Sequence, residues 1–207
     1  NAPRTNNPLL DLVATAFNDT LTPAELASVR AGGYLAQDVT ASLRVLSLNT
    51  VVYSVYHIPD VTKQTHDPLG QFAWLEAQLE AARQDNVAVY VVGHIPPTIG
   101  SYAKKENWHP NYVSTFNKLL AKYRHTVKAQ LFGHLHSDEF RLPSNTDHPI
   151  PLLIAPSVTP VYQNNPSFRV VSFDRASGTI LDYATYYLPI NPPQQQQQQQ
   201  QQPQWTP

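Results

Sequence analysis

The spacing of apolar and polar residues predicts strands that alternate with helices up to about residue 143. Short apolar runs at residues 43–48, 87–92 and 127–132 have the length and composition of buried strands. Between them, residues 67–84 and 112–123 repeat apolar side chains at steps of three and four, as one face of an amphipathic helix does. Strands joined in this order by helices and short connections predict an α/β fold, a sheet layered with helices.

Two further helices are predicted before the first of these strands, over residues 8–17 and 22–32. The second begins with Thr22 as its cap and Pro23 in the first helical position, and Glu25 completes a capping box. The helix that opens at Asp67 has the same signals, because Asp67 can cap it and Pro68 suits its first position.

The pattern of predicted elements changes after residue 143. Residues 152–155, 168–173 and 180–183 read as strands between Pro, Asn and Gly turns, and we expect them to pair as an antiparallel flank of the main sheet. The glutamine run at residues 194–202 cannot bury a core and is predicted to be disordered. The chain is therefore divided into units 1–143, 144–190 and 191–207, and the last of these is predicted to be a disordered tail rich in glutamine and proline.

Charge and composition exclude several classes of protein. Fourteen Lys and Arg against 15 Asp and Glu give a net charge of −1, which offers no electrostatic basis for binding nucleic acid or an anionic membrane. No apolar run approaches the roughly 20 residues of a membrane span. The absence of cysteine excludes disulfides and thiolate ligands. Because the chain has no methionine and opens at Asn1 without a leader, we interpret it as a piece of a longer polypeptide.

One sequon, Asn18-Asp19-Thr20, could accept a glycan in a secretory setting. Such triplets also arise by chance, so both interpretations stay open.

Three histidines follow predicted strands directly. His94 comes after residues 87–92, and His134 and His136 come after residues 127–132. The carboxyl ends of neighbouring strands meet at one edge of a sheet, and imidazole is a common ligand of zinc and similar ions. We therefore predict a metal site of which this chain holds one side. On a continuing strand the last two rings would share a face, whereas in a turn they could diverge toward two ions.

Glycine precedes His94 and His134, and we expect it to let the backbone turn sharply and approach the ring. A single histidine at a strand end is also a common structural residue, so the pair His134 and His136 carries more weight than His94. The remaining histidines are assigned surface or hydrogen-bonding roles: His57, His66, His109, His125 and His148.

Two carboxylates, Asp138 and Glu139, follow the last of these histidines. Two-metal sites usually need carboxylates that bridge and neutralise the ions. These two alternate with Phe140 and Arg141 as the chain leaves the site, so we interpret them as second-shell partners or structural anions rather than bridges.

The segments GHIPP (93–97) and GHLHSDEF (133–140) resemble the last two metal-binding motifs of calcineurin-like metallophosphoesterases. The extension DEF (138–140) is similar to that of the acid sphingomyelinase branch. Further segments agree with that branch, and the similarity extends over residues 8–190: LTPAEL (21–26), GGY (32–34), LRVLSLN (43–49), DPLGQFAWL (67–75), APS (155–157) and NPSFRV (165–170).

The resemblance implies a four-layer α/β/β/α sandwich holding two divalent ions, usually zinc. It implies that His94 and His134 bind one ion and His136 the other. By the same likeness, residues 1–143 would be the carboxy-terminal half of the catalytic domain and 144–190 a carboxy-terminal β extension. The family's earlier motifs are an Asp-x-His, a bridging aspartate and an Asn-His pair whose histidine protonates the leaving group. This sequence contains none of them, so we expect the acid/base group to lie upstream.

Two hypotheses about function follow from the resemblance. The chain is expected to be the carboxy-terminal part of a secreted or lysosomal/vacuolar phosphodiesterase acting on a sphingomyelin-like lipid, a nucleotide or a polyphosphate, and to be inactive alone. The alternative is a non-catalytic remnant or binding module that keeps the fold. A glutamine-rich interaction protein is a third idea, but nine glutamines are more typical of a solvated linker.

Overall fold

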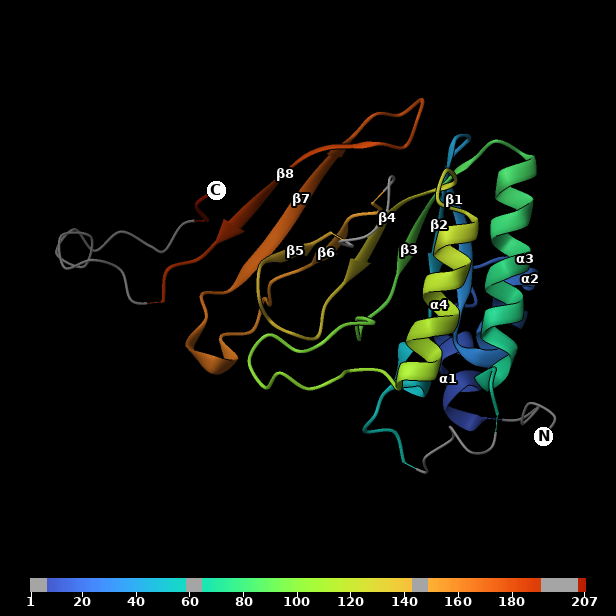
Figure 1. The fold of residues 1–207 in the computed structure, drawn as a ribbon, viewed down its shortest axis with the longest axis horizontal. Helices are drawn as coiled ribbons and strands as arrows, with labels where there is room; N and C mark the ends of the chain where they lie inside the picture. The colour runs from blue at the N-terminus through green and yellow to red at the C-terminus, as the bar shows by residue number, and fades with distance from the viewer. Residues whose placement is uncertain (1–6, 59–64, 143–148, 191–204) are drawn as a thin grey trace, which may run out of the picture.

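The computed structural model describes residues 7–58, 65–142, 149–190 and 205–207. Its main sheet has six strands in the order β1-β2-β3-β4-β6-β5, and two more strands pair separately (Figure 1). The strands are β1 (Leu35–Thr40), β2 (Leu43–Ser47), β3 (Ala88–Val92), β4 (Val127–Phe132), β5 (Glu139–Arg141), β6 (Leu152–Ile154), β7 (Ser167–Phe173) and β8 (Ile180–Tyr187). The helices are α1 (Pro8–Ala16), α2 (Pro23–Gly32), α3 (Gln71–Gln84) and α4 (Pro110–Lys122), with short 3₁₀ turns at Thr50–Tyr53, Pro68–Gly70 and Val161–Gln163.

Four neighbouring strands of the main sheet, β2, β3, β4 and β6, run parallel, and β1 and β5 close its two sides antiparallel. The register pairs Ser47 with Val92, Val92 with Leu131, and Phe132 with Ile154, so the four carboxyl ends lie level along one edge. In open parallel sheets ligands bind outside this edge. His94 and His134 follow β3 and β4 there.

One face of the main sheet is covered by α3 and α4, which lie side by side (Figure 1). Aromatic side chains dominate the core beneath them; Tyr53 stacks on Phe72 with ring centroids 4.7 Å apart, and Trp108 is completely buried. This core lies next to the loop that carries His94, because the Trp108 indole donates a 2.9 Å hydrogen bond to the carbonyl of Ile95.

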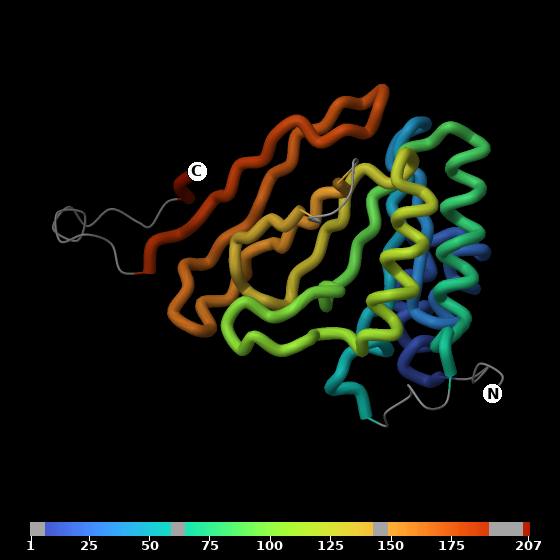
Figure 2. The backbone as a smooth tube through the Cα atoms, in the orientation of Figure 1, coloured from blue at the N-terminus to red at the C-terminus, as the bar shows by residue number. Residues whose placement is uncertain are grey.

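The opposite face of the sheet is covered by the β7–β8 hairpin (Figure 2). Tyr90 of β3 meets Phe173 edge-on at 6.3 Å, and its hydroxyl donates a 2.7 Å hydrogen bond to the carbonyl of Gly178 in the hairpin turn. The described residues thus form three layers, helix, sheet and sheet, and the predicted α/β class is confirmed.

The structure corrects the expected pairing of the last strands. β7 and β8 pair antiparallel as expected, but residues 152–154 are not part of that flank. They form β6, which is parallel to β4 in the main sheet. Because β6 belongs to the same sheet as the strands before residue 143, the division into 1–143 and 144–190 separates strands that are hydrogen-bonded to one another. The division itself remains a prediction. Residues 143–148 lie outside the described part of the chain.

The predicted helix start at Thr22 is confirmed, whereas the helix predicted to open at Asp67 with Pro68 in its first position begins at Gln71, and Pro68 lies in the preceding 3₁₀ turn. Thr22 and Glu25 form the capping box, and α2 ends at Gly33 in the left-handed conformation with φ 74°. The carboxylate of Asp67 accepts hydrogen bonds from the backbone N–H groups of Phe72 (2.7 Å) and Ala73 (3.1 Å). It therefore caps α3 from across the intervening 3₁₀ turn.

The end of the chain differs from the expectation of disorder over 191–207. Thr206 and Tyr187 exchange two backbone hydrogen bonds, of 2.8 and 2.9 Å, and Trp205 packs edge-on against Phe168 at 5.0 Å. The glutamine run itself lies outside the described residues. None of the described helices is long and apolar enough to cross a membrane.

Candidate metal centre

The loop after β3 holds His94 by fixing the residues on both sides of it. A Cβ atom on Gly93 would lie 2.6 Å from Thr50 Cγ2 and 2.8 Å from Phe132 Cε1, so glycine is required there for close approach. Ile95 donates its backbone N–H to the Thr50 hydroxyl at 2.8 Å. The Trp108 indole donates to the carbonyl of Ile95, so both backbone groups of Ile95 are hydrogen-bonded. His94, the residue before it, is exposed at the sheet edge.

The loop after β4 turns at His134 itself. Leu135 donates its backbone N–H to the carbonyl of Gly133 at 2.8 Å across His134, whose φ is 71°. This is a γ-turn of the rare positive-φ form, which is strained for a residue with a side chain. The expectation that Gly133 would supply the sharp turn is therefore wrong: the positive φ falls on the histidine, and backbone strain of this kind is common at functional sites.

The two loops bring His94 and His134 together. The backbone N–H of Gly133 donates to the carbonyl of His94 at 3.0 Å. The Nδ1 atom of His134 lies 3.3 Å from the Nε2 atom of His94, with the rings at 79° to each other. Two nitrogens that each lie 2.0–2.1 Å from one tetrahedral zinc ion are about 3.4 Å apart. The pair therefore fits two ligand positions of a single ion; the same separation also suits a hydrogen bond when one nitrogen carries a proton.

The electrostatics of this pair favour the form of histidine that binds metals. Partial burial lowers the pKa of His134. The rings of His94 and His136 lower this pKa further, because a positive charge on either ring would repel a positive charge on His134. His134 consequently stays neutral over a wider pH range than a free histidine. Neutral imidazole is the ligand form.

His136 lies in a separate hollow. Its φ is 55°, so the segment from Gly133 is a turn rather than a continuing strand. Its ring lies 5.5 Å from that of Tyr162, and it lines a hollow of about 500 Å³. Its Nδ1 atom is buried without a hydrogen-bond partner among the described residues, which leaves one ring nitrogen unsatisfied.

The three predicted ligands do not form one cluster. Within the described part of the chain, no three His, Cys, Asp or Glu residues gather closely enough to hold a metal ion. The structure brings together His94 and His134, and His136 stands apart in its own hollow. This arrangement accords with two rings on one ion and the third on another, but the ligand assignment remains a prediction.

The two predicted second-shell carboxylates have basic partners. Arg169 of β7 donates to Asp138 in an ion pair. Glu139 accepts hydrogen bonds from the hydroxyl of Ser101 (2.5 Å) and from Arg141 (2.8 Å). Burial alone would raise the pKa of Glu139, but these two donors outweigh burial and lower the pKa. The contacts match the structural-anion interpretation; a second-shell role remains a prediction.

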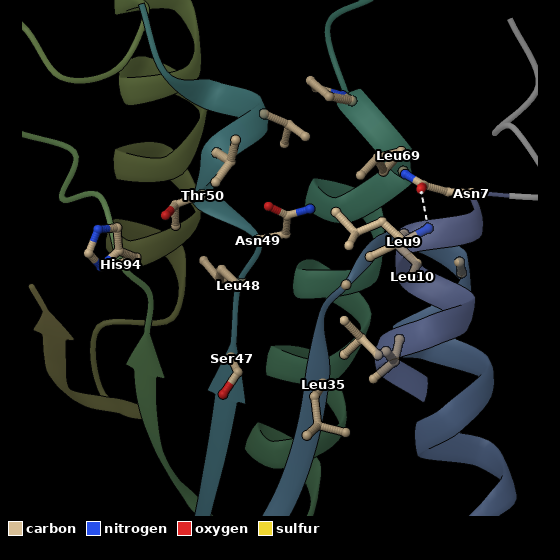
Figure 3. A pocket seen from close by; sticks show the side chains of 18 of the residues that line it. Asn7, Leu9, Leu10, Leu35, Ser47, Leu48, Asn49, Thr50, Leu69 and His94 are labelled. Atoms are coloured by element: carbon tan, nitrogen blue, oxygen red, sulfur yellow. Dashed lines mark hydrogen bonds between the residues drawn. The ribbon is translucent and has the colours of Figure 1, made fainter. Parts of the chain in front are cut away.

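A cavity of about 1540 Å³ opens at the carboxyl end of β2, beside His94 (Figure 3). Leu9 and Leu10 of α1 line one side, and Asn49, Thr50 and His94 line the other. His57 also lines it.

Asn49 is fixed at this edge by a residue that the sequence analysis did not single out. The fully buried amide of Gln71 bonds both the N–H (2.7 Å) and the carbonyl (3.0 Å) of Asn49. In the sequence, the only sign of this interaction is that a polar residue, Gln71, stands among the apolar positions of the predicted helix.

The other predicted positions are placed as follows. Asn18 is exposed in the turn after α1, so the sequon is accessible, and glycosylation remains a prediction. His66 and His125 are exposed, His57 and His109 are half-buried, and His148 lies outside the described residues.

Three comparisons with known proteins bear on this site. No family model matches the chain. It is 39% identical over 162 residues to "Sphingomyelinase phosphodiesterase D" of Dictyostelium discoideum, which covers 75% of this chain and 36% of that protein. It is 33% identical to human "Sphingomyelin phosphodiesterase" (87% of this chain, 28% of that protein) and 32% identical to bovine "Cyclic GMP-AMP phosphodiesterase SMPDL3A" (90% and 43%). The chain thus spans less than half the length of these relatives.

The fold resembles that of a dimetal phosphatase from Danio rerio, with a TM-score of 0.52 at 13% identity over 84% of this chain and 61% of that one. The two proteins therefore share a similar fold. The chain is a homologue of the acid sphingomyelinase and acid sphingomyelinase-like phosphodiesterases, as its motifs predict.

Proposed function

We propose that the chain is the carboxy-terminal part of a two-metal phosphodiesterase in which His94 and His134 bind one ion and His136 binds the other. The observation that carries the proposal is the 3.3 Å separation of His134 Nδ1 and His94 Nε2 at the carboxyl edge of a parallel sheet. The dimetal phosphatase neighbour supports two ions, and imidazole ligands suit zinc among other transition metals.

The residues of this chain would bind and orient. Thr50, Gly93 and Trp108 hold the loop of His94, and the γ-turn holds His134, so both rings are fixed before a ligand arrives. When bound, two such ions neutralise charge on a phosphoryl group and lower the pKa of a coordinated water. The cavity beside His94 gives a phosphodiester room to approach.

The remaining parts of the proposal concern the whole protein. Bridging carboxylates and the acid/base histidine would lie in polypeptide outside this chain, which accords with its covering less than half of its relatives. Substrates would be phosphodiesters such as sphingomyelin-like lipids, nucleotides or polyphosphates, in a secreted or lysosomal/vacuolar setting.

Calorimetric titration with Zn²⁺, together with hydrolysis of bis-p-nitrophenyl phosphate, tests the proposal. Residues 1–207 alone should bind at most one ion weakly and show no turnover, whereas a longer protein that includes the upstream sequence should bind two ions and hydrolyse the ester. Tight binding of two ions with turnover by residues 1–207 alone would contradict the fragment proposal. A metal-loaded longer protein without hydrolysis would contradict the phosphodiesterase proposal.

The second candidate is a binding module that keeps the fold without turnover. It is favoured by the observation that no three potential ligands form a cluster within the described residues. The same two assays separate the candidates, because a binding module retains Zn²⁺ affinity in the longer protein and lacks hydrolysis.

A further inference from the structure

His136 adopts a backbone conformation that needs support from outside its own loop. Its φ of 55° lies in the left-handed region, which is unfavourable for a residue with a Cβ atom. His134 has a local support, the hydrogen bond from Leu135 to Gly133. The neighbouring Ser137 hydroxyl donates a 3.1 Å hydrogen bond to the carbonyl of Leu135, not to that of His136. The carbonyl of His136 is therefore available to another donor.

That donor is Asn164. Its side-chain Nδ2 donates a 2.9 Å hydrogen bond to the carbonyl of His136, 28 residues away in sequence. Asn164 follows a tight turn in which Gln163 donates its N–H to the carbonyl of Pro160 at 3.0 Å, and Tyr162 and Gln163 both have positive φ values, of 66° and 63°. The amide is therefore presented by a constrained segment.

The same turn also touches the ring. The Tyr162 ring lies 5.5 Å from the His136 ring, tilted by 60°. Metal-ligating histidines commonly have their second ring nitrogen fixed by a carboxylate or carbonyl. The buried Nδ1 of His136 has no such partner among the described residues. The orientation of this imidazole therefore depends on its backbone and on packing, and residues 160–164 supply a contact of each kind.

We propose that Asn164 is a positioning residue for His136: its side-chain amide fixes the carbonyl of His136, and with it the orientation of the imidazole that would bind a metal ion. The inference rests on the proposed function, because it presupposes that His136 is a ligand. Asn164 acts through His136 and needs no contact with metal or substrate. Its side chain is exposed, so it can be replaced without opening the core.

Protection of histidines from diethyl pyrocarbonate by Zn²⁺, measured by mass spectrometry for each histidine of the longer protein that includes the upstream sequence, tests this role. Two variants remove the donor: Asn164→Asp keeps the size of the side chain, and Asn164→Leu adds no charge. Asn165→Asp is the matched control, since Asn165 uses its Oδ1 to accept from the N–H of Ile190 and aspartate retains that acceptor. A melting curve for each variant verifies the fold.

The expected result is that Zn²⁺ protects His136 in the unsubstituted longer protein and in its Asn165→Asp variant, and that the Zn²⁺ concentration needed rises about tenfold or more in both Asn164 variants. Protection of His94 and His134 should be unchanged, which a general loss of structure would not allow. Equal protection of His136 in all variants would overturn the positioning role and leave the proposed function intact. Absence of Zn²⁺ protection at His136 in the unsubstituted longer protein would instead overturn its assignment as a ligand, and the inference with it.

Discussion

The Nδ1 atom of His134 lies 3.3 Å from the Nε2 atom of His94, and the backbone of Gly133 is hydrogen-bonded to the carbonyl of His94. Ring contact and backbone contact together mean that the two loops cannot move apart independently. The pair is thus prearranged by neighbouring parallel strands, and a metal ion would find two nitrogens already at the spacing of its ligands.

Replacing either ring of the pair should weaken metal binding without unfolding the protein. Both rings are exposed at the sheet edge, so His94→Ala and His134→Ala leave the core intact. We expect each to lower Zn²⁺ affinity by at least about tenfold in calorimetric titrations. His125→Ala, on an exposed histidine beyond α4, is the control and should bind as the unsubstituted chain does.

The pKa of His134 should depend on His94. Removing a neighbouring ring removes part of the electrostatic opposition to protonation, so His94→Asn should raise the pKa of His134 toward its ordinary value of 6.5 while partial burial still lowers it. The C2 proton shift of His134 in an NMR pH titration measures this. A downward or absent change would mean that the rings are not neighbours in solution.

The same lowered pKa predicts the pH dependence of stability. Between the ordinary pKa of 6.5 and the lowered folded value, the unfolded chain binds a proton at His134 that the folded chain does not. The free energy of unfolding should therefore fall as the pH decreases through this window. Urea titrations of metal-free protein at several pH values should show the fall, and His134→Gln should show a smaller one; an equal fall in both would assign it to other groups.

Gly93→Ala should destabilise the protein by about 1–3 kcal/mol, because the new methyl group would overlap Thr50 Cγ2 and the Phe132 ring. Gly133→Ala is the matched control: its Cβ atom would meet only the His94 ring nitrogen and carbonyl at 3.6 Å or more, and Gly133 has no positive φ. Urea titration measures both. Adding Thr50→Ser to Gly93→Ala removes the clashing methyl, keeps the hydroxyl that Ile95 uses, and should restore part of the stability.

Asp67→Ala should reduce the free energy of unfolding by about 1 kcal/mol, since it leaves the N–H groups of Phe72 and Ala73 at the start of α3 without their acceptor. Asp67→Asn retains one side-chain oxygen and should lie between the two proteins in a urea titration. Equal midpoints for all three would show that water replaces the cap.

Local sequence determined the elements whose signals are short-range. The capping box at Thr22 and Glu25 and the apolar runs of β3 and β4 specify their own conformations, and all are found where predicted. β1 was missed because its residues are largely exposed and polar, such as Gln37 and Asp38, so that pairing with β2 rather than burial makes it a strand. β5 was missed because it has three residues and two of them form an ion pair.

By itself the sequence determined the fold class, the family resemblance and the identity of the candidate ligands, because caps, apolar periodicity and motif residues are encoded locally. Only the tertiary structure decided that β6 runs parallel to β4, that the strain of the second loop falls on His134, and that His136 is held by Asn164. Each of these depends on which distant segments become neighbours. Strand direction and the convergence of two loops are set by the packing of the whole sheet, which no run of adjacent residues contains.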